Sequence, residues 1–412
     1  MNPIKNKNII LGVTGSIAAY KAADLASKLA QNGAKVECIL TAAATNFIHP
    51  ITFQSVTGQR AFTESDLWGT DAHVLHIGLA QNANFMVIAP ASANTLAKLA
   101  HGIADNLLTV TALALQRDQT PTPLLLAPAM DAGMYAHPAT QENLQILKQR
   151  GNYVIGPEEG HLASGLVAKG RMSEPGTILG QIRYILSRGQ SLNGKKLIVT
   201  AGGTQEGIDP VRYITNRSSG KQGYALAQAA LDAGADVTLI SGPTHLPQPS
   251  GIKFVAIQTA ADLEQAVLSA CHSAQALIMA AAVADFRPAH PSNQKIKKEK
   301  GSIFLELEQT SDILTSVYSY RQQTGFPNFV AGFAAETQAL LKNAKVKLES
   351  KGLDLIIAND VSAADAGFGV DNNRVTLLWA DGKMEEMPLS SKYKIAETII
   401  ERLAENFCRN DS

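Results

Sequence analysis

The chain has 412 residues, more than the roughly 250 to 300 at which single hydrophobic cores stop growing, so we expect two domains. Its 45% hydrophobic and 17% charged residues are typical of a globular protein and exclude a disordered chain. Because 36 basic and 36 acidic residues leave a net charge of zero, we expect no nucleic acid and no membrane among its partners.

The cysteines and the N-terminal residues bear on the cellular location. The three cysteines, Cys38, Cys271 and Cys408, show no CxxC or Cys/His spacing, so we expect them to be reduced and assign them no metal site. Residues Met1–Asn8 carry two lysines but lack the apolar core of a signal peptide, and no stretch reaches the roughly 18 apolar residues of a membrane span. These observations predict a cytoplasmic protein.

The first half of the chain opens with a strand, a turn and a helix. The apolar run Ile9–Val13 predicts a strand, a helical pattern ends at Gly33, and Val36–Leu40 predicts the next strand. Three further buried strands are expected, each followed by a loop marked by Pro or Gly: Phe85–Ala89, Leu124–Ala127 and Tyr153–Ile155. Since ligands bind outside the carboxyl ends of the strands in an open parallel sheet, these three loops are expected to converge on one site.

The second half repeats this plan. The strand Leu197–Ala201, the helix Gly223–Leu231 and the strand Val237–Ser241 form another opening unit. We expect further strands at Ala276–Ala280, Ile303–Leu307, Phe329–Phe333 and Leu355–Ala358, a hairpin of Val375–Trp379 with Met384–Met387, and a helix at about Lys392–Asn406. The fold class is therefore α/β, with two Rossmann-like, doubly wound domains at residues 1–190 and 191–412, joined by the polar linker Ser187–Asn193.

Neither glycine turn fits a standard nucleotide fingerprint. The sequence GVTGSIA at residues 12–18 lacks the GxGxxG spacing, and SSGKQG at residues 218–223 has Gln222 where Ser or Thr follows the lysine of a P-loop. An NAD-type oxidoreductase and a Walker-type ATPase are therefore disfavoured. Strand-to-helix turns rich in hydroxyls and glycine suit a phosphate monoester, and a tight turn without a ligand is the alternative.

Four loops of the first half together resemble the flavin-containing cysteine decarboxylases. They are GVTGSIAAYK (residues 12–21), APASANT (89–95), GIADNLLT (102–109) and PAMDAGMY (128–135). The resemblance implies bound FMN, a flavin site shared between subunits, and a homo-oligomer built from trimers. The residues that it places at the FMN are Gly12, Thr14, Gly15, Ser16, Thr41, Ser92, Asn94, Thr95, Asp105 and Asn106.

Three positions of this half are implied to be catalytic. His76 matches the family histidine that moves the thiol proton, although a structural histidine is the alternative. Asp131 stands where the family has an asparagine that holds the substrate carboxylate, and Ser164 stands where the family has a proton-donating cysteine. Three outcomes are open: a compensated decarboxylase, an enzyme that stops at the enethiol, and a flavin-binding relic retained for assembly.

The segment Ala201–Ala227 closely resembles the phosphopantothenate–cysteine ligases, and the order of the halves matches the bacterial bifunctional coenzyme A biosynthesis flavoproteins. The resemblance implies ligation of L-cysteine to 4′-phosphopantothenate by CTP and Mg²⁺ through an acyl cytidylate. Decarboxylation of phosphopantothenoylcysteine to 4′-phosphopantetheine follows. The alternative is an active ligase joined to a flavin-binding domain that is inactive or stops at the enethiol.

The same resemblance implies the residues of the ligase site. Asn216 and Arg212 match positions beside the acyl cytidylate, and Lys295 of the run KIKK matches a triphosphate contact, although such a run alone is typical of a solvated surface. The nucleotide-binding residues implied besides Lys295 are Ala280, Ala281, Asp285, Ser311, Asp312, Ile313, Leu314, Phe333, Lys347 and Lys351. Dimers of this domain and trimers of the other imply a dodecamer.

Overall fold

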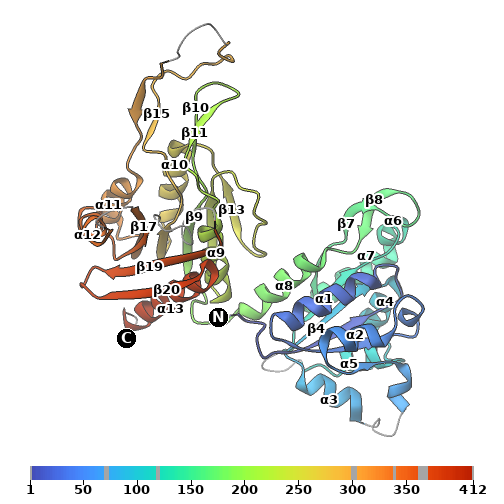
Figure 1. The fold of residues 1–412 in the computed structure, drawn as a ribbon. Coiled ribbons are helices and arrows are strands. Elements are labelled where there is room, and N and C mark those ends of the chain that lie inside the picture. Colours follow the sequence, from blue (N-terminus) through green and yellow to red (C-terminus); the bar gives the residue numbers. More distant parts are fainter. Residues whose placement is uncertain are drawn as a thin grey trace. The chain divides into compact units, whose positions relative to one another are not determined.

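A computed structural model describes residues 2–68, 74–116, 121–297, 304–336, 340–360 and 370–410. The chain divides into two compact units, Asn2–Leu186 and Ser187–Ser412 (Figure 1). The division falls at the start of the polar segment that the sequence marks as a linker.

The N-terminal unit contains one sheet whose paired strands are all parallel. Its strands, in spatial order, are β3 (Ala61–Phe62), β2 (Lys35–Leu40), β1 (Asn8–Val13), β4 (Phe85–Ala91), β5 (Leu124–Pro128) and β6 (Tyr153–Val154). The five expected strands of this half are present, but β6 is not buried as expected, since it lies at the edge of the sheet and Tyr153 is 42% exposed. The sequence did not predict β3, because two residues are too short to show a periodic pattern.

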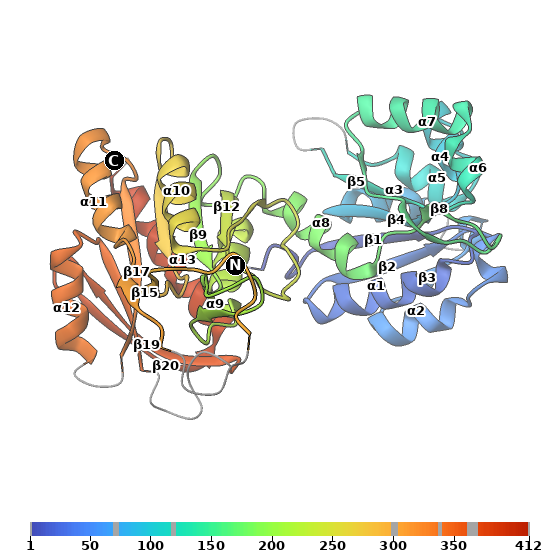
Figure 2. The same cartoon turned by 90° about the horizontal axis from the view of Figure 1, so that it is seen from above.

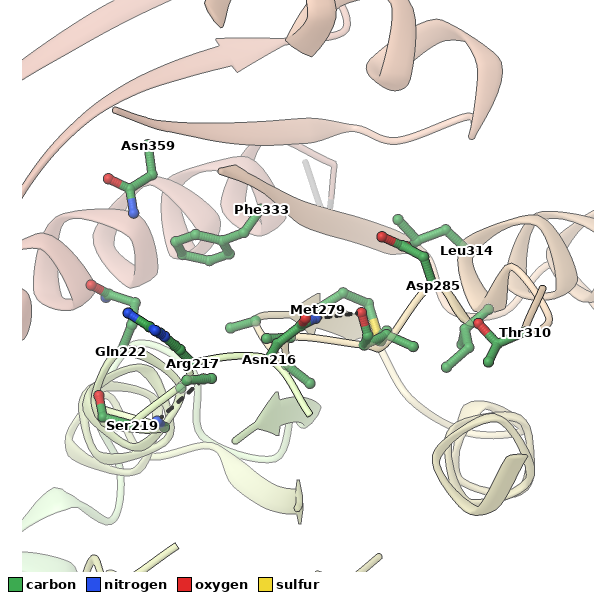
Figure 3. A pocket seen from close by; sticks show the side chains of 18 of the residues that line it. Asn216, Arg217, Ser219, Gln222, Met279, Asp285, Thr310, Leu314, Phe333 and Asn359 are labelled. Atoms are coloured by element: carbon green, nitrogen blue, oxygen red, sulfur yellow. Dashed lines mark hydrogen bonds between the residues drawn. The ribbon is translucent and has the colours of Figure 1, made fainter. Parts of the chain in front are cut away.

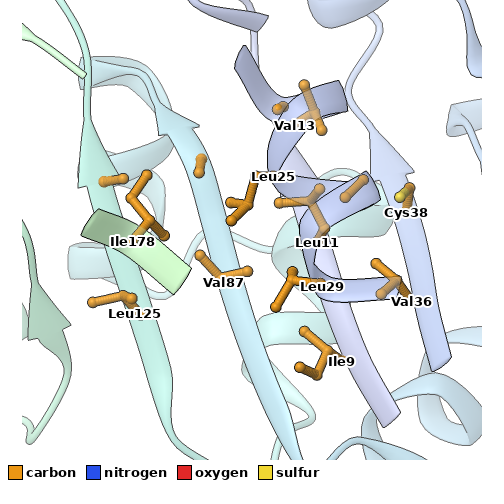
Figure 4. Close-up of a cluster of buried hydrophobic side chains, with 14 of the residues drawn as sticks. Ile9, Leu11, Val13, Leu25, Leu29, Val36, Cys38, Val87, Leu125 and Ile178 are labelled. Atoms are coloured by element: carbon orange, nitrogen blue, oxygen red, sulfur yellow. The ribbon is translucent and has the colours of Figure 1, made fainter. Parts of the chain in front are cut away.

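Helices cover both faces of this sheet, and each face has its own hydrophobic core. Against one face pack α1 (Ala19–Gln31), α2 (Pro50–Thr57) and α8 (Pro175–Ser187), and against the other pack α3 (Leu75–Asn82), α4 (Ala93–His101), α5 (Leu107–Leu113) and α7 (Pro138–Gln149). Figure 4 shows Leu25 and Leu29 of α1 against Leu11 and Val87 of the sheet. Cys38 lies in the same core, and burial raises the pKa of its thiol.

Smaller elements complete this unit at the carboxyl ends of the strands. They are the 3-10 helices η1 (Ala44–Asn46) and η2 (Glu64–Trp68), the short helix α6 (Ala132–Ala136) and the hairpin of β7 (Glu158–His161) with β8 (Val167–Arg171). Ser164 lies in the turn of this hairpin.

The C-terminal unit contains a larger mixed sheet. Its strands, in spatial order, are β13 (Lys253–Ala256), β12 (Asp236–Ser241), β9 (Lys196–Ala201), β14 (Ala276–Met279), β17 (Phe329–Glu336), β18 (Leu355–Asp360), β19 (Asn372–Trp379) and β20 (Met384–Ser391). The first six are parallel, whereas β19 and β20 form the expected antiparallel hairpin. The doubly wound fold class is thereby confirmed for both units.

Helices also cover both faces of this second sheet (Figure 2). The core on one face contains side chains of α10 (Ala260–Cys271), α11 (Ile313–Thr324) and α12 (Leu340–Ser350). On the other face α9 (Lys221–Asp232) contacts β9 and β12, and α13 (Lys392–Asn410) packs along α9. Tyr393 of α13 fixes this pair, because its hydroxyl donates to the buried Asp232 Oδ2 at 2.8 Å.

Two antiparallel ribbons extend from the C-terminal unit, and we call them the arm (Figure 1). They are β10 (Gln205–Gly207) with β11 (Tyr213–Thr215), and β15 (Phe286–Pro288) with β16 (Leu307–Gln309). The strand expected at Ile303–Leu307 is therefore wrong: of its described residues only Leu307 is in a strand, and that strand lies in the arm. The apolar run is not buried in the main sheet, since Phe304 is 91% exposed.

Candidate active sites

A cavity of about 600 Å³ lies at the carboxyl ends of β1, β4 and β5 in the N-terminal unit. Ser16 follows β1, Ser92 follows β4 and Asp131 follows β5, and all three line the cavity. The hairpin closes the other side with residues that include Ser164. The expected convergence of loops is therefore present, with the hairpin in place of a simple loop after β6.

Thr14 joins two of these loops. Its side chain is buried, and its hydroxyl donates to the Pro90 carbonyl at 2.7 Å and accepts from the Ser92 N–H at 2.9 Å. Ser92 Oγ in turn caps α4 by accepting from the Thr95 N–H at 3.3 Å. The start of α4 is thereby held beside the turn after β1, an arrangement that suits an anionic group.

Asp131 and Ser164, the two positions that depart from the decarboxylase pattern, contact each other. The Ser164 hydroxyl donates to Asp131 Oδ2 at 2.6 Å, and the Gly133 N–H donates to Oδ1 at 3.0 Å. Both bonds lower the pKa of the Asp131 carboxyl, and the bond from Ser164 has the larger effect. The base of the hairpin is also fixed, because the Met130 N–H donates to the Gly170 carbonyl at 3.1 Å.

A group of charged side chains at this cavity was not predicted from the sequence. Lys21 is buried, and its Nζ donates to the Met172 carbonyl at 3.2 Å and to Glu174 Oε1 at 2.9 Å. Arg171 donates to the same Glu174 oxygen at 2.5 Å. Both cations lower the pKa of the Glu174 carboxyl, and Lys21 has the larger effect. Lys21 ends the motif at residues 12–21, so the motif itself was an available signal.

The other residues that the resemblance places at the flavin do not line this cavity. Among the described residues, His76 lies on α3 with a buried Nδ1 that has no hydrogen-bond partner. Asn106 caps α5, and Asp105 pairs with Lys98 at 2.7 Å. Further expected residues outside the cavity lining are Gly12, Thr14, Thr41, Asn94 and Thr95. One chain thus brings together Gly15, Ser16, Ser92, Asp131 and Ser164.

The C-terminal unit has a pocket of about 670 Å³ where β14, β17 and β18 end (Figure 3). The first turn of α9 and the start of α11 form its walls. Ten of the expected ligase residues line it: Asn216, Ala280, Ala281, Asp285, Ser311, Asp312, Ile313, Leu314, Phe333 and Lys347.

Hydrogen bonds fix the loop after β14 in this pocket. The Thr200 hydroxyl accepts from the N–H groups of Ala280 and Ala281, both at 3.0 Å. Asn216 Nδ2 donates to the Val283 carbonyl at 2.8 Å, which holds the segment before α9 against the same loop. Figure 3 shows Asn216 and Asp285 on one side of the Phe333 ring.

The two lysines that were expected on one helix differ in their positions, because Lys347 lies on α12 whereas Lys351 lies just beyond its last residue, Ser350. Lys347 lines the pocket, and its Nζ donates to the Phe333 carbonyl at 3.2 Å. Lys351 does not line it; its Nζ lies 2.7 Å from Asp312 Oδ2. Burial raises the pKa of Asp312, but the bonds from Lys351 and from the Thr315 N–H outweigh burial, so the net shift is downward.

Several pocket residues were missed by the sequence analysis: Lys221, Gln222, Asn359, Asn373 and Lys392. The side-chain oxygens of Gln222 and Asn359 are buried without a hydrogen-bond partner among the described residues, and both lie beside Phe333 (Figure 3). The pKa of the Lys392 ammonium is lowered, mainly by burial and to a smaller extent by the positive charge of Lys221. Lys221 and Gln222 lie within the sequence SSGKQG, so a signal was present for these two.

Arg212 lies in the turn between β10 and β11 of the arm, and Lys295 lies in the segment between β15 and β16. Neither residue lines the pocket of its own chain. The Arg212 guanidinium donates to Asp209 Oδ2 at 2.6 and 3.0 Å and to the Ile296 carbonyl at 2.6 Å. Lys295 is exposed next to Ile296. Lys298, the last residue of the run KIKK, lies outside the described residues.

Two kinds of feature are absent from the described part of the chain. No helix there has both the length and the apolar character needed to cross a membrane. Nor do the described residues contain a group of three or more His, Cys, Asp or Glu side chains placed to hold a metal ion.

Comparisons with known proteins cover nearly the whole chain. A family described as "Flavoprotein" matches residues 2–187, and one described as "DNA/pantothenate metabolism flavoprotein C-terminal domain" matches residues 192–407. The Coenzyme A biosynthesis bifunctional protein CoaBC of Bacillus subtilis is 44% identical over 404 residues, which cover 97% of each chain. The chain belongs to the family of bifunctional coenzyme A biosynthesis proteins.

Further members of this bifunctional family agree in length. The protein of the same name from Vibrio cholerae is 43% identical over 408 residues, 98% of this chain and 100% of the relative. A crystal structure of the C-terminal domain of such a protein is 36% identical, with a TM-score of 0.45, and covers 54% of this chain and 100% of its own. The FMN binding protein AtHal3 is 32% identical, with a TM-score of 0.39, over 44% of this chain and 97% of its own.

Proposed function

We propose that the C-terminal unit ligates L-cysteine to 4′-phosphopantothenate with CTP as co-substrate and Mg²⁺ bound to the triphosphate. Family membership supports the ligase activity. One observation carries the assignment to this pocket: Asn216 and Asp285 share it with Lys221, Lys347 and Lys392. The reaction joins anionic reactants and releases pyrophosphate, so it needs fixed cations that neutralise the negative charge.

The proposed reaction has two steps. The carboxylate of 4′-phosphopantothenate attacks the α-phosphate of CTP, pyrophosphate leaves, and an acyl cytidylate forms. The cysteine amine then attacks the acyl carbon and CMP leaves. Asn216 suits a place beside this anhydride, because its amide offers hydrogen bonds without adding a nucleophile or a charge. The loop Ala280–Ala281, which Thr200 fixes, would form the wall next to Asn216.

Arg212 and Lys295 are proposed to serve the pocket of a second copy in a homo-oligomer. Their position outside the pocket of their own chain supports this proposal. So does the arm surface, where Val211 is 58%, Tyr213 50% and Phe304 91% exposed, because exposed apolar groups mark contact surfaces. Dimers through the arms and trimers through the N-terminal units would make the dodecamer that the resemblance implies.

For the N-terminal unit we propose decarboxylation of phosphopantothenoylcysteine to 4′-phosphopantetheine, with FMN bound in the cavity. The volume of about 600 Å³ is within the range of ligand pockets. Ser16 and Ser92 suit the phosphate, and the apolar side chains of Met130 and Met134 suit the ring. Bound FMN supplies an electron acceptor for the substrate thiol. His76 would act from a neighbouring subunit.

We assign residues 1–190 to the decarboxylase and 191–412 to the ligase, and the cytoplasmic location stays a prediction. The alternative of a working ligase joined to an inactive N-terminal domain is not favoured, because relatives that match nearly the full length are named as bifunctional.

Separate assays test the two halves. With 4′-phosphopantothenate, cysteine, Mg²⁺ and one nucleotide at a time, CTP is expected to give phosphopantothenoylcysteine and CMP, and ATP to give much less product. Asn216→Ala is expected to stop this ligation but to leave decarboxylation of added phosphopantothenoylcysteine at the wild-type rate. Equal use of ATP and CTP would overturn the nucleotide assignment.

A further inference from the structure

Decarboxylation consumes one proton. The bond between carbon and carboxylate breaks, CO₂ leaves, and the electron pair ends in a new C–H bond on the carbon left behind. The cavity of the N-terminal unit therefore needs a group that delivers a proton to that carbon.

Few side chains that line the cavity can deliver this proton near neutral pH. Lys21 and Arg171 are both bound to Glu174, and ammonium and guanidinium groups are weak acids at pH 7. His161, which is exposed at the end of β7, is one candidate. A second candidate is the Tyr20 hydroxyl, which also lines the cavity, and a third is the hydrogen-bonded pair of Ser164 and Asp131, whose Oγ and Oδ2 atoms are 2.6 Å apart.

We propose that Asp131 and Ser164 act as one proton-delivering pair: Asp131 takes up a proton when a ligand carboxylate enters the cavity, and Ser164 passes a proton to the carbon that CO₂ has left. The proposal rests on the decarboxylase function proposed above. It adds the source of the proton, and it makes the two departures from the family pattern parts of one device.

The direction of the hydrogen bond explains why uptake is needed. In the structure the Ser164 hydroxyl donates to Asp131 Oδ2, so its one proton points at the carboxylate and not into the cavity. A proton on Oδ2 reverses this bond, because Oδ2 then donates to Ser164 Oγ and the serine proton is released toward the cavity. As the Ser164 O–H bond breaks and the C–H bond forms, Ser164 takes the Asp131 proton, and Asp131 becomes a carboxylate again.

A ligand carboxylate is the event that would load the pair. Hydrogen bonds from the Ser164 hydroxyl and then the Gly133 N–H lower the pKa of Asp131 and so favour its ionised form. A second carboxylate beside Asp131 raises its pKa by like-charge repulsion. The cations that line the cavity, Lys21 on α1 and Arg171 on β8, are paired with Glu174 and so neutralise the two carboxylates only in part.

Proton uptake can be measured without turnover. The FMN-loaded protein is titrated calorimetrically at pH 7, in buffers of different ionisation enthalpy, with phosphopantothenoylalanine, which has the carboxylate but no thiol. The control ligand is the matching ethylamide, which lacks the carboxylate. We expect uptake of about one proton with the first ligand and none with the second, and Asp131→Asn is expected to abolish the uptake. Absent uptake in the wild type, or uptake lost in His161→Gln and kept in Asp131→Asn, would overturn the proposal.

The rate of CO₂ release tests the delivery step. Ser164→Ala and Asp131→Asn are each expected to slow single-turnover release by about 10²-fold, and the double variant no further, because the two side chains act as a unit. Ligase turnover of the same samples reports correct folding. If the variants release CO₂ as fast as wild type, the proposed proton delivery by Asp131 and Ser164 is overturned, but the decarboxylase assignment is not. If the wild-type protein releases no CO₂, the decarboxylase assignment itself is overturned.

Discussion

The backbone N–H of Ser92 donates to the Thr14 hydroxyl at 2.9 Å, and this bond joins the turn after β1 to the start of α4. Because the same hydroxyl donates to the Pro90 carbonyl, one buried side chain satisfies two backbone groups. The position of the proposed FMN phosphate site therefore depends on a residue that does not itself line the cavity.

Thr14→Val is expected to weaken FMN binding and to destabilise the N-terminal unit. Valine keeps the shape but leaves the Pro90 carbonyl and the Ser92 N–H without partners, at a cost of about 1 to 3 kcal/mol. Thr14→Ser, which keeps the hydroxyl, is the matched control. Flavin fluorescence titration and thermal unfolding measure the two effects, and a valine variant equal to wild type in both would contradict the role of this bond.

Lys347 of α12 and Lys351, which follows the end of that helix, should differ in their effect on the ligase. Lys347 lines the pocket, so Lys347→Ala is expected to lower kcat/KM for CTP by about 10²-fold. Lys351 forms a partly exposed ion pair with Asp312, worth about 1 kcal/mol or less, so Lys351→Ala should lower it by about fivefold at most. Lys345→Ala, an exposed position on the same helix, is the control. A larger loss at Lys351 than at Lys347 would show that CTP displaces the Asp312 pair.

Asp209 makes the stability of the C-terminal unit depend on acid pH. Burial raises the pKa of its carboxyl, but bonds from the N–H groups of Val211, Ile296 and Arg212 and from the Arg212 guanidinium bring it down to about 2. Since the folded pKa is below the unfolded value near 3.9, the stabilisation is complete above about pH 4 and is lost as the pH falls toward 2.

Asp209→Asn should therefore destabilise the unit at pH 7, and the difference from wild type should shrink between pH 4 and 2. Urea unfolding followed by Trp379 fluorescence measures this, in a Trp68→Phe background that removes the tryptophan of the other unit, which is 87% exposed. The prediction fails if the difference at pH 2.5 equals that at pH 7.

Gln222→Met is expected to weaken the use of CTP without a large change in the stability of the protein. The Gln222 side-chain oxygen is buried without a partner among the described residues, so its removal offsets the loss of the 3.3 Å bond from Gln222 Nε2 to the Lys392 carbonyl, and the variant should stay within about 1 kcal/mol of wild type. If this oxygen accepts from the nucleotide, KM for CTP should rise several-fold. Thermal unfolding and ligase kinetics of one preparation give both values, and an unchanged KM would remove Gln222 from the binding site.

Periodicity predicted most strands of the two main sheets because they are apolar runs of four to eight residues, whereas β3 and the half-buried β13 were missed. The same rule failed at residues 303–307, since an exposed apolar arm has the pattern of a buried strand. Lys392 was missed because it is brought to the pocket by the packing of α13 on α9, a contact between segments far apart in the sequence. The contact of Ser164 with Asp131 was missed for the same reason, as the hairpin folds back over the loop after β5.

The coupled reaction tests the central claim most directly. The purified chain is loaded with FMN and incubated with 4′-phosphopantothenate, L-cysteine, CTP and Mg²⁺, and the products are followed by mass spectrometry together with the flavin absorbance. We predict CMP, CO₂ and 4′-phosphopantetheine in equal amounts, with the flavin oxidised at the end. Accumulation of phosphopantothenoylcysteine without CO₂ would contradict the bifunctional account, and absence of even this ligated product would contradict the ligase.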